Sequence, residues 1–382
     1  GVASIDQLLE GQVAGMTAIP TNGAPGAPSK MRIRSTVSLS GGTDPLWVLD
    51  GMILEGNDIP TNFSDKDNID NLYNTSIAGV NPADIENITI LKDAAATAIY
   101  GARAANGVIV ITTKKGASGK LKLNVRADWG FSNKAIDYRP ILNGEDRRDI
   151  LYMGLKNYAL NSGKDETYAV NYADNNIDKY AAKPWSGYTD WEDVLFRNGS
   201  HQNYEVNAQG GNERTKFYTS FGYTKQEGIT LQSGYERITG RANMSHKADR
   251  VTIEASTMFT NSTQNVNSEG TSFSSPIMCL AMTASPSTFP YNEDGTFSTS
   301  FPALNGANPL QTATYNYDRS TIVRTLNTLS ATWNIWDNLN IKETLGYDFN
   351  QTNNRVWWDP RSNDGRSSKG VFQRYMMNRS KL

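Results

Sequence analysis

The sequence has few of the residues on which enzymes and metal sites usually depend. Among its 382 residues there are two histidines, His201 and His246, and one cysteine, Cys279. A single cysteine forms no disulfide within the chain, and neither histidine has a partner at the spacing of metal ligands. Metal-dependent and histidine-based catalysis are therefore not indicated, and we expect no cofactor.

The sequence also lacks an excess of charge of either sign. It carries 37 Lys and Arg against 39 Asp and Glu, a net charge of -2. Nucleic-acid-binding proteins usually show a basic excess, so we expect no nucleic-acid partner.

Long hydrophobic runs are missing as well. Mean hydropathy is -0.53, and no apolar run approaches the roughly 18–20 residues of a membrane-spanning helix. Hydropathy does not detect transmembrane β-strands, because their side chains alternate between apolar and polar. The 32 Gly, 18 Tyr and 8 Trp are typical of a turn-rich, aromatic β protein.

Residues 1–119 predict a mixed α/β domain. Ser4 and Gln7 form a capping box at the start of a helical stripe of apolar residues. An apolar strand ends in the Asp-Gly turn at 50–51, and a strand rich in β-branched residues covers 107–113. Short helices and short strands of this kind build a compact mixed module.

The pattern changes after a polar linker at 114–120. Residues 121–132 alternate strictly, with these side chains on one face: Leu121, Leu123, Val125, Ala127, Trp129 and Phe131. A strand of about a dozen residues suits a tilted membrane strand. A helical, tyrosine-rich excursion follows at roughly 143–182.

Further long, two-faced strands run to the end of the sequence. The connections at 210–213 and 247–250 are tight, whereas 261–320 is a long loop rich in Ser, Thr, Asn and Pro. Short turns on one rim and long loops on the other are expected of outer-membrane barrels. Residues 120–382 therefore predict about seven or eight antiparallel strands of a transmembrane β-barrel, incomplete in this chain.

Specific motifs add a family resemblance. The stretches DPLWVLDG at 44–51, DIENITILKD at 84–93 and NGVIVITTK at 106–114 resemble the plug domain of TonB-dependent transporters, in the form typical of the SusC/RagA-like subfamily. The run DWEDVLFR at 190–197 and the loop YNEDG at 291–295 also match. The resemblance covers nearly the whole chain.

The resemblance implies a location and a mechanism. Such proteins lie in the outer membrane of Gram-negative bacteria, surrounded by lipid, and TonB pulls on an N-terminal box to move the plug out of the barrel. A SusD-like surface lipoprotein closes the barrel and helps to capture the substrate, usually an oligosaccharide and sometimes a peptide. The barrel should have about 22 strands, so we expect this chain to be incomplete at both ends.

Charged residues suggest how the plug is held. Arg32, Arg34 and Arg103 are candidates to pair with Glu205 and Glu254, since both acids fall on the polar face of their strands. Such pairs would be breakable, because each contributes only about 1 kcal/mol when hydrated. The alternative is hydrated charge in the lumen without a fixed partner.

The long loop supplies candidates for contact with the substrate or the lid protein. Aromatic faces and planar polar groups suit sugars, and the candidates are Phe273, Phe289, Tyr291, Asn292, Glu293, Asp294, Phe297 and Tyr315. Simple loop packing is the alternative for each of them. Residues 292–295 could equally form a turn, and their oxygens are too few to indicate a structural calcium ion.

Other classes fit less well. The stretch at 116–120 resembles a phosphate loop only faintly and precedes a strand instead of a helix. No carboxylate pair is singled out for glycoside hydrolysis, so we expect no enzyme. Outward apolar side chains such as Phe217 and Phe221 argue against a soluble β-sandwich. A signal-transducing receptor, or siderophore or cobalamin uptake by the same fold, stays open.

Overall fold

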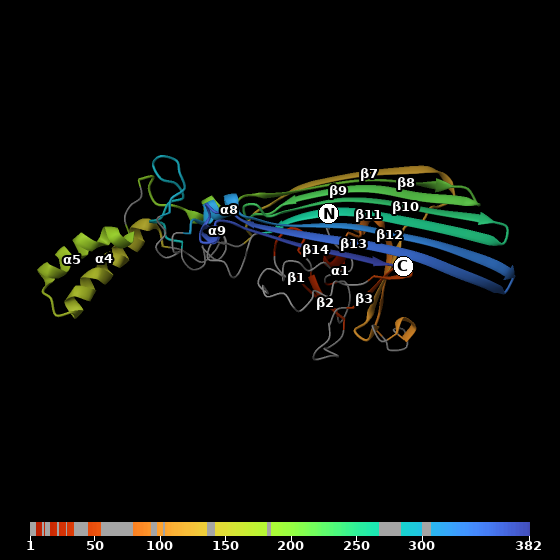
Figure 1. Cartoon of the computed structure of the whole chain (residues 1–382), viewed down its shortest axis with the longest axis horizontal. Helices are drawn as coiled ribbons and strands as arrows, with labels where there is room; N and C mark the ends of the chain where they lie inside the picture. The colour runs from red at the N-terminus through yellow and green to blue at the C-terminus, as the bar shows by residue number, and fades with distance from the viewer. Residues whose placement is uncertain are drawn as a thin grey trace.

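The computed structural model describes residues 5–9, 11, 16–20, 23–27, 29–33, 45–54, 79–92, 98–101, 104–135, 142–181, 185–266, 284–299 and 307–382. A wide antiparallel sheet dominates it (Figure 1). The smaller N-terminal elements lie on one side of this sheet, and a helical hairpin extends beyond one end of its strands (Figure 1). Among the described residues, no helix is both long and apolar enough to cross a membrane.

The wide sheet has eight strands, and each pairs only with its neighbours in sequence. The strands are β7 (Gly119–Ser132), β8 (Gly199–Gly211), β9 (Thr215–Glu227), β10 (Gly234–Ala248), β11 (Val251–Val266), β12 (Tyr317–Trp336), β13 (Leu339–Trp358) and β14 (Val371–Lys381). This order is the meander expected of an up-and-down barrel, and the sheet is an open part of one.

The predicted alternation of side chains is confirmed. Val125 on β7 stands opposite Val206 on β8, which stands opposite Phe221 on β9, so apolar side chains form rows across the sheet. Phe221 is 55% exposed, whereas Arg241 and Asn243 on the other face of β10 are buried. The exposed face is therefore apolar and the covered face polar, the reverse of a soluble domain.

The connections are asymmetric, with one correction to the prediction. Tight turns join β8 to β9, β10 to β11 and β12 to β13, while the other connections are longer. The long loop spans 267–316 instead of 261–320, because β11 continues to Val266 and β12 begins at Tyr317. Backbone pairing extends through this polar stretch, where Asn265 stands opposite Arg319, and ladder hydrogen bonds do not depend on apolar side chains.

The N-terminal module is built on a sheet of four strands in the order β4-β3-β6-β5. Its elements are α1 (Ile5–Leu9), β1 (Thr17–Pro20), β2 (Ser29–Arg32), β3 (Leu46–Leu49), β4 (Met52–Leu54), η2 (Pro82–Asp84), β5 (Ile85–Leu91), η3 (Ala98–Tyr100) and β6 (Val108–Thr113). β3 and β6 run parallel and are almost completely buried, which explains their continuous apolar sequence. Leu49 and Ile111 share one core cluster with Met258 and Leu326 of the wide sheet, so the module packs directly against the sheet.

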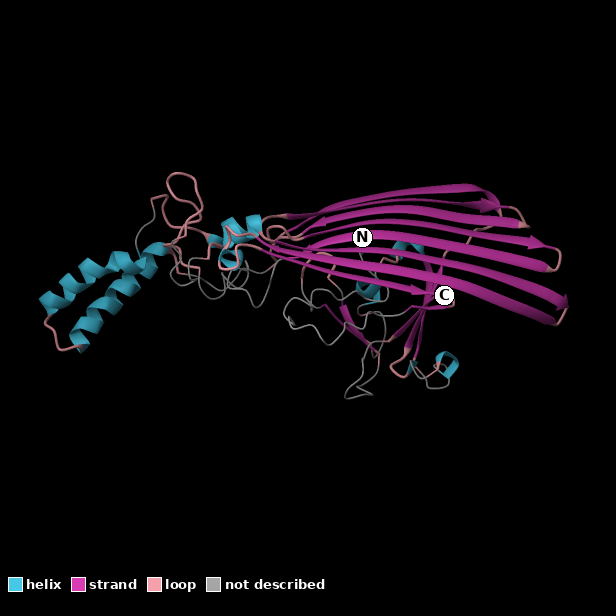
Figure 2. Cartoon of the chain, in the orientation of Figure 1, coloured by secondary structure: helices cyan, strands magenta, loops and turns pink. Residues whose placement is uncertain are grey.

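Helices occupy the connections at one end of the strands (Figure 2). The excursion predicted at 143–182 is a hairpin of α4 (Gly144–Asn161) and α5 (Glu166–Ala181). Asn143 caps α4 by accepting a hydrogen bond from the backbone N–H of Asp146. The shorter helices are α6 (Trp191–Leu195), α8 (Pro309–Tyr315) and α9 (Asn363–Arg366). The helix predicted before Tyr100 is seen only as η3, since 93–97 lie outside the described residues, as does Cys279.

Candidate functional site: the contact between plug and barrel wall

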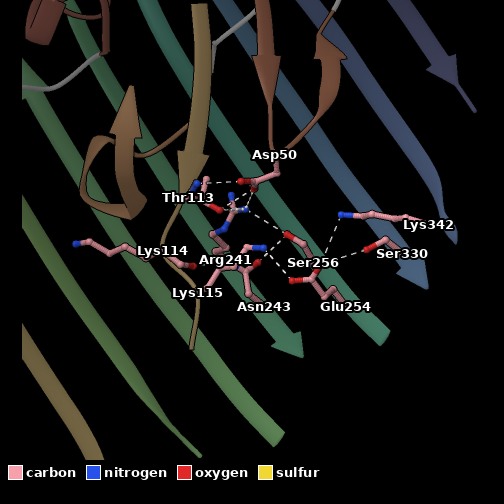
Figure 3. Close-up of polar contacts among 10 residues, drawn as sticks. All are labelled: Asp50, Thr113, Lys114, Lys115, Arg241, Asn243, Glu254, Ser256, Ser330 and Lys342. Carbon is pink, nitrogen blue, oxygen red and sulfur yellow. Dashed lines mark hydrogen bonds and ion pairs between the residues drawn. The ribbon is translucent and has the colours of Figure 1, made fainter. Parts of the chain in front are cut away.

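The centre of the contact is the turn between β3 and β4 (Figure 3). Asp50 and Gly51 form a two-residue turn, and both have positive φ, 49° and 89°, as a type I′ hairpin requires. The Asp50 carboxylate accepts hydrogen bonds from the Thr113 backbone N–H at 2.9 Å and from the Thr113 hydroxyl at 2.7 Å. These two bonds fix the carboxylate at the end of β6, where it faces the wide sheet.

Arg241 on β10 meets this carboxylate from the other side. Its Nη2 lies 2.5 Å from Asp50 Oδ2, 2.6 Å from Thr113 Oγ1 and 3.2 Å from Ser256 Oγ. The Arg241 side chain is 2% exposed, and its Nε and Nη1 atoms have no hydrogen-bond partner among the described residues. Removing one member of such a buried pair typically costs about 3–5 kcal/mol, although the intact pair adds little net stability. The pair therefore specifies where the module sits.

The linker after β6 is fastened beside this pair. Asn243 Nδ2 donates to the Lys114 carbonyl at 2.7 Å, and Lys115 Nζ donates to Glu254 Oε1 at 2.8 Å. Lys342 on β13 lies 3.7 Å from the other oxygen of Glu254. A small polar cavity of about 90 Å³ separates these groups and is lined by Asp50, Asn243, Glu254, Ser256, Ser330 and Lys342. A cavity this polar can admit water, which competes for the ion pairs.

A second contact lies under η2. The hydroxyl of Tyr218, which is 1% exposed, donates to Asp84 Oδ1 at 2.8 Å, and Thr260 Oγ1 donates to the Gly79 carbonyl at 2.7 Å. Asp84 is also buried, so this bond satisfies a carboxylate that water does not reach.

Two glycines of the wall make room for the module. A Cβ atom at Gly222 would lie 2.9 Å from Asn81 Nδ2, and one at Gly346 would overlap Met52. Both approaches are closer than side chains tolerate, so the absence of a side chain at these positions allows the module to seat.

The structure places the predicted pairing residues differently from the prediction. Glu254 is joined to Lys115 and Lys342, and Glu205 accepts a hydrogen bond from Asn203 at 3.2 Å. Within the described ranges, no ion pair links Arg32 to either acid. The predicted residues Arg34 and Arg103 lie outside those ranges, so their pairing stays a prediction.

The sequence prediction missed the Asp50–Arg241 pair. A partial signal was present, because Arg241 falls on the polar face of its strand and Asp50 ends a plug strand. Alternation identifies the face of a side chain but not the plug residue opposite it.

The loop candidates gather partly into one group at the other end of the sheet. Tyr291 stacks on Phe297 with centroids 5.1 Å apart, Phe297 meets Tyr315 edge-on at 5.4 Å, and Arg361 lies 3.7 Å above the Tyr315 ring. Phe289 is partly buried nearby in sequence, and Phe273 lies outside the described residues. Two connections, β11 to β12 and β13 to β14, thus meet in one aromatic cluster, held by stacking and cation–π contacts.

The loop at 292–295 forms the turn that was one of its two predicted interpretations. Gly295 N donates to the Asn292 carbonyl at 3.0 Å, and Glu293 is exposed. The Thr296 hydroxyl and backbone N–H donate to Asp294, which lowers the pKa of that carboxyl. The described residues contain no group of three His, Cys, Asp or Glu side chains placed to hold a metal ion.

Comparisons with known proteins identify this arrangement. Residues 1–108 match the family described as TonB-dependent Receptor Plug Domain. The chain is 35% identical over 242 residues to the TonB-dependent receptor SusC of Bacteroides thetaiotaomicron, covering 62% of this chain and 20% of SusC. It is 30% identical over 357 residues to the TonB-dependent receptor P3 of Formosa agariphila, covering 91% of this chain and 31% of P3.

Comparison with solved structures indicates the same class of protein. The structure of the RagAB peptide importer in its closed-closed state matches 94% of this chain and 40% of the solved chain, with a TM-score of 0.72 and 25% identity. The structure of the RagAB peptide transporter matches 95% of this chain with the same TM-score and identity.

A plug beneath antiparallel wall strands defines the TonB-dependent receptor class. Within that class, this chain belongs to the SusC/RagA-like family. The chain spans between a fifth and a third of the length of the curated relatives, 20% of SusC and 31% of P3.

Proposed function

We propose that this chain forms the plug and part of the barrel of an importer that carries a bulky nutrient across the outer membrane of a Gram-negative bacterium. The observation that carries the proposal is the seating of the plug by the Asp50–Arg241 pair and the Asp84–Tyr218 bond. These are a few specific polar contacts beside a polar cavity, so pulling can separate them without disrupting the wall. TonB is the proposed source of that pull.

An oligosaccharide is the proposed substrate class, and a peptide is the second candidate. Exposed rings favour sugar binding, because sugars stack their apolar faces on aromatic side chains. Tyr291 is 41% exposed, and Trp185, which is 55% exposed, donates to the Tyr291 carbonyl at 3.3 Å. The peptide candidate rests on the likeness to the RagAB peptide importer.

The proposed partners are a SusD-like lipoprotein at the outer end and lipid around the wall. The connections at that end are bonded to one another, since Trp191 Nε1 donates to the Ser285 carbonyl at 3.0 Å and Asn316 Nδ2 donates to Asp364 Oδ2 at 2.9 Å. A bonded set of loops is a suitable seat for a lid. The apolar exposed face of the strands supports lipid contact.

One uptake experiment tests this function. Cells that carry the full-length protein are given a labelled oligosaccharide, a labelled peptide, a ferric siderophore or cobalamin, with and without functional TonB. Oligosaccharide uptake that requires TonB supports the proposal, and peptide uptake would assign the second substrate class. Uptake that does not depend on TonB, or uptake of only the siderophore or cobalamin, would overturn it.

A further inference from the structure

Glu254, on the covered face of β11, stands between two cations of different origin (Figure 3). Its Oε1 accepts a hydrogen bond from Lys115 Nζ at 2.8 Å, and its Oε2 lies 3.7 Å from Lys342 Nζ. Lys115 belongs to the linker that leaves the plug, whereas Lys342 belongs to the wall strand β13. Displacement of the plug with its linker therefore removes one partner and leaves the other.

Displacement of the plug also removes hydrogen-bond partners from Arg241 on the neighbouring strand β10, and more of them than from Glu254. Its Nη2 contacts Asp50 and Thr113 of the plug, and Ser256 is the wall residue that it contacts, at 3.2 Å. As the plug begins to separate, the neutral hydroxyl of Ser256 is the hydrogen-bond partner that remains to the guanidinium among the described residues. A buried charge without a counter-ion is strongly unfavourable, so the unpaired Arg241 charge opposes release of the plug.

Ser256 lies along the route by which the Arg241 guanidinium can reach Glu254. Ser256 and Glu254 are two residues apart on β11, so they share one face and their Cα atoms are about 6.8 Å apart. Ser256 lies between Arg241 and Glu254 in Figure 3. Arg241 stands opposite Met258 and Glu254 opposite Ser245, four residues further along the pair of strands, but the Arg241 guanidinium already reaches Ser256, two residues from Glu254. The Nε and Nη1 atoms of Arg241, buried and without a partner among the described residues, are donors that Glu254 can accept.

We propose that Glu254 exchanges partners as the plug is displaced, releasing Lys115 and taking up Arg241 while Arg241 releases Asp50. The proposal rests on the proposed import function, because only a plug that moves requires the exchange. It keeps both wall charges paired throughout the step and so lowers the barrier to release. Glu254 is then a positioning residue for plug movement as well as a tether at rest.

The test separates the exchange from simple tethering. The full-length protein is placed in a planar bilayer, the plug is pulled by an N-terminal handle, and the rate of release is read as the onset of conductance. Lys115→Met removes the tether and speeds release. In that background the ion pair of Glu254 with the linker is gone and its pair with Lys342 lies within the wall, so Glu254→Gln reports on the exchange, and we expect release to slow by roughly tenfold.

A matched control variant is Glu213→Gln in the same background. Glu213 is exposed in the turn between β8 and β9, so its loss should leave the release rate unchanged. If Lys115→Met with Glu254→Gln releases as fast as Lys115→Met alone, Glu254 is only a tether and the exchange is wrong. If the unaltered plug cannot be released under load at all, the import function itself fails. A full-size conductance step after release shows that each barrel is folded.

Discussion

Arg241 in the wall and Asp50 in the plug turn are 191 residues apart in sequence, yet Arg241 Nη2 lies 2.5 Å from Asp50 Oδ2. The same carboxylate accepts two hydrogen bonds from Thr113 at the end of β6. It therefore joins the β3–β4 turn both to β6 within the plug and to the wall. Because either charge alone is costly in a buried position, the pair has only one favourable arrangement, with the plug seated.

Replacing Asp50 by Asn should loosen the plug. The amide keeps the size of the side chain but leaves Arg241 buried without a counter-charge, at a cost of about 3–5 kcal/mol. We expect a higher resting conductance in planar bilayers and entry of large antibiotics into cells. Asp337→Asn, at the exposed turn between β12 and β13, is the control. A resting conductance equal to that of the unaltered protein would contradict a seating role for the pair.

Tyr218→Phe should weaken the second contact without a change of shape. The substitution leaves the buried carboxylate of Asp84 without the hydroxyl that donates to it at 2.8 Å, a loss of about 1–3 kcal/mol. A lower urea midpoint for plug unfolding, followed by intrinsic fluorescence, is the expected result. Tyr223→Phe lies on the opposite, apolar face of the same strand and should have little effect. Equal midpoints for both variants would show that the Asp84 bond does not hold the plug.

Gly346→Leu should displace the plug by overlap with Met52, because a Cβ atom at this position already has no room. We expect increased leakage, and we expect Met52→Ala in the same protein to reduce it. Gly240→Leu is the matched control, since a Cβ there meets nothing within 4 Å. Leakage that Met52→Ala does not change would mean that the damage arises in the strand and not at the contact.

Arg361→Gln should weaken the outer loop near neutral pH and flatten its dependence on acid. Arg361 donates two hydrogen bonds to Asp359, at 2.8 and 2.9 Å, and holds the pKa of that carboxyl well below its usual range. A lowered pKa of Asp359 stabilises the loop above the ordinary value of about 3.9, and this stability is lost progressively as the pH falls below that value toward the folded pKa. In the variant the pKa returns toward the ordinary value, so the loop should be less protected near pH 6 and should change little with pH, whereas the unaltered protein should lose protection toward pH 3.

Hydrogen exchange of the backbone amides around α9, measured between pH 3 and pH 6 by quenched mass spectrometry, checks this expectation. Lys369→Gln, at an exposed position in the same connection, should keep the profile of the unaltered protein. The same profile for Arg361→Gln would show that the ion pair does not stabilise the loop.

Local patterns in the sequence predict much of the architecture. Strict alternation over 121–132 predicts both the strand β7 and its apolar face, because side chains in a strand point to opposite sides in turn. The tyrosine-rich stretch at 143–182 predicts a helical excursion, which the structure resolves into α4 and α5. The predicted end of β11 was wrong, because residues 261–265 are polar and alternation of apolar side chains does not detect them, although they pair with β12.

The sequence by itself therefore determined the class of the protein: a plug followed by two-faced wall strands, with the motifs of one family. Only the tertiary structure decided which charges hold the plug. Glu254 binds Lys115 of the linker, which the sequence did not single out, and Asp50 meets Arg241. The reason is physical: a strand of period two specifies the face of each side chain, but the seating of one domain on another selects the partner across that face.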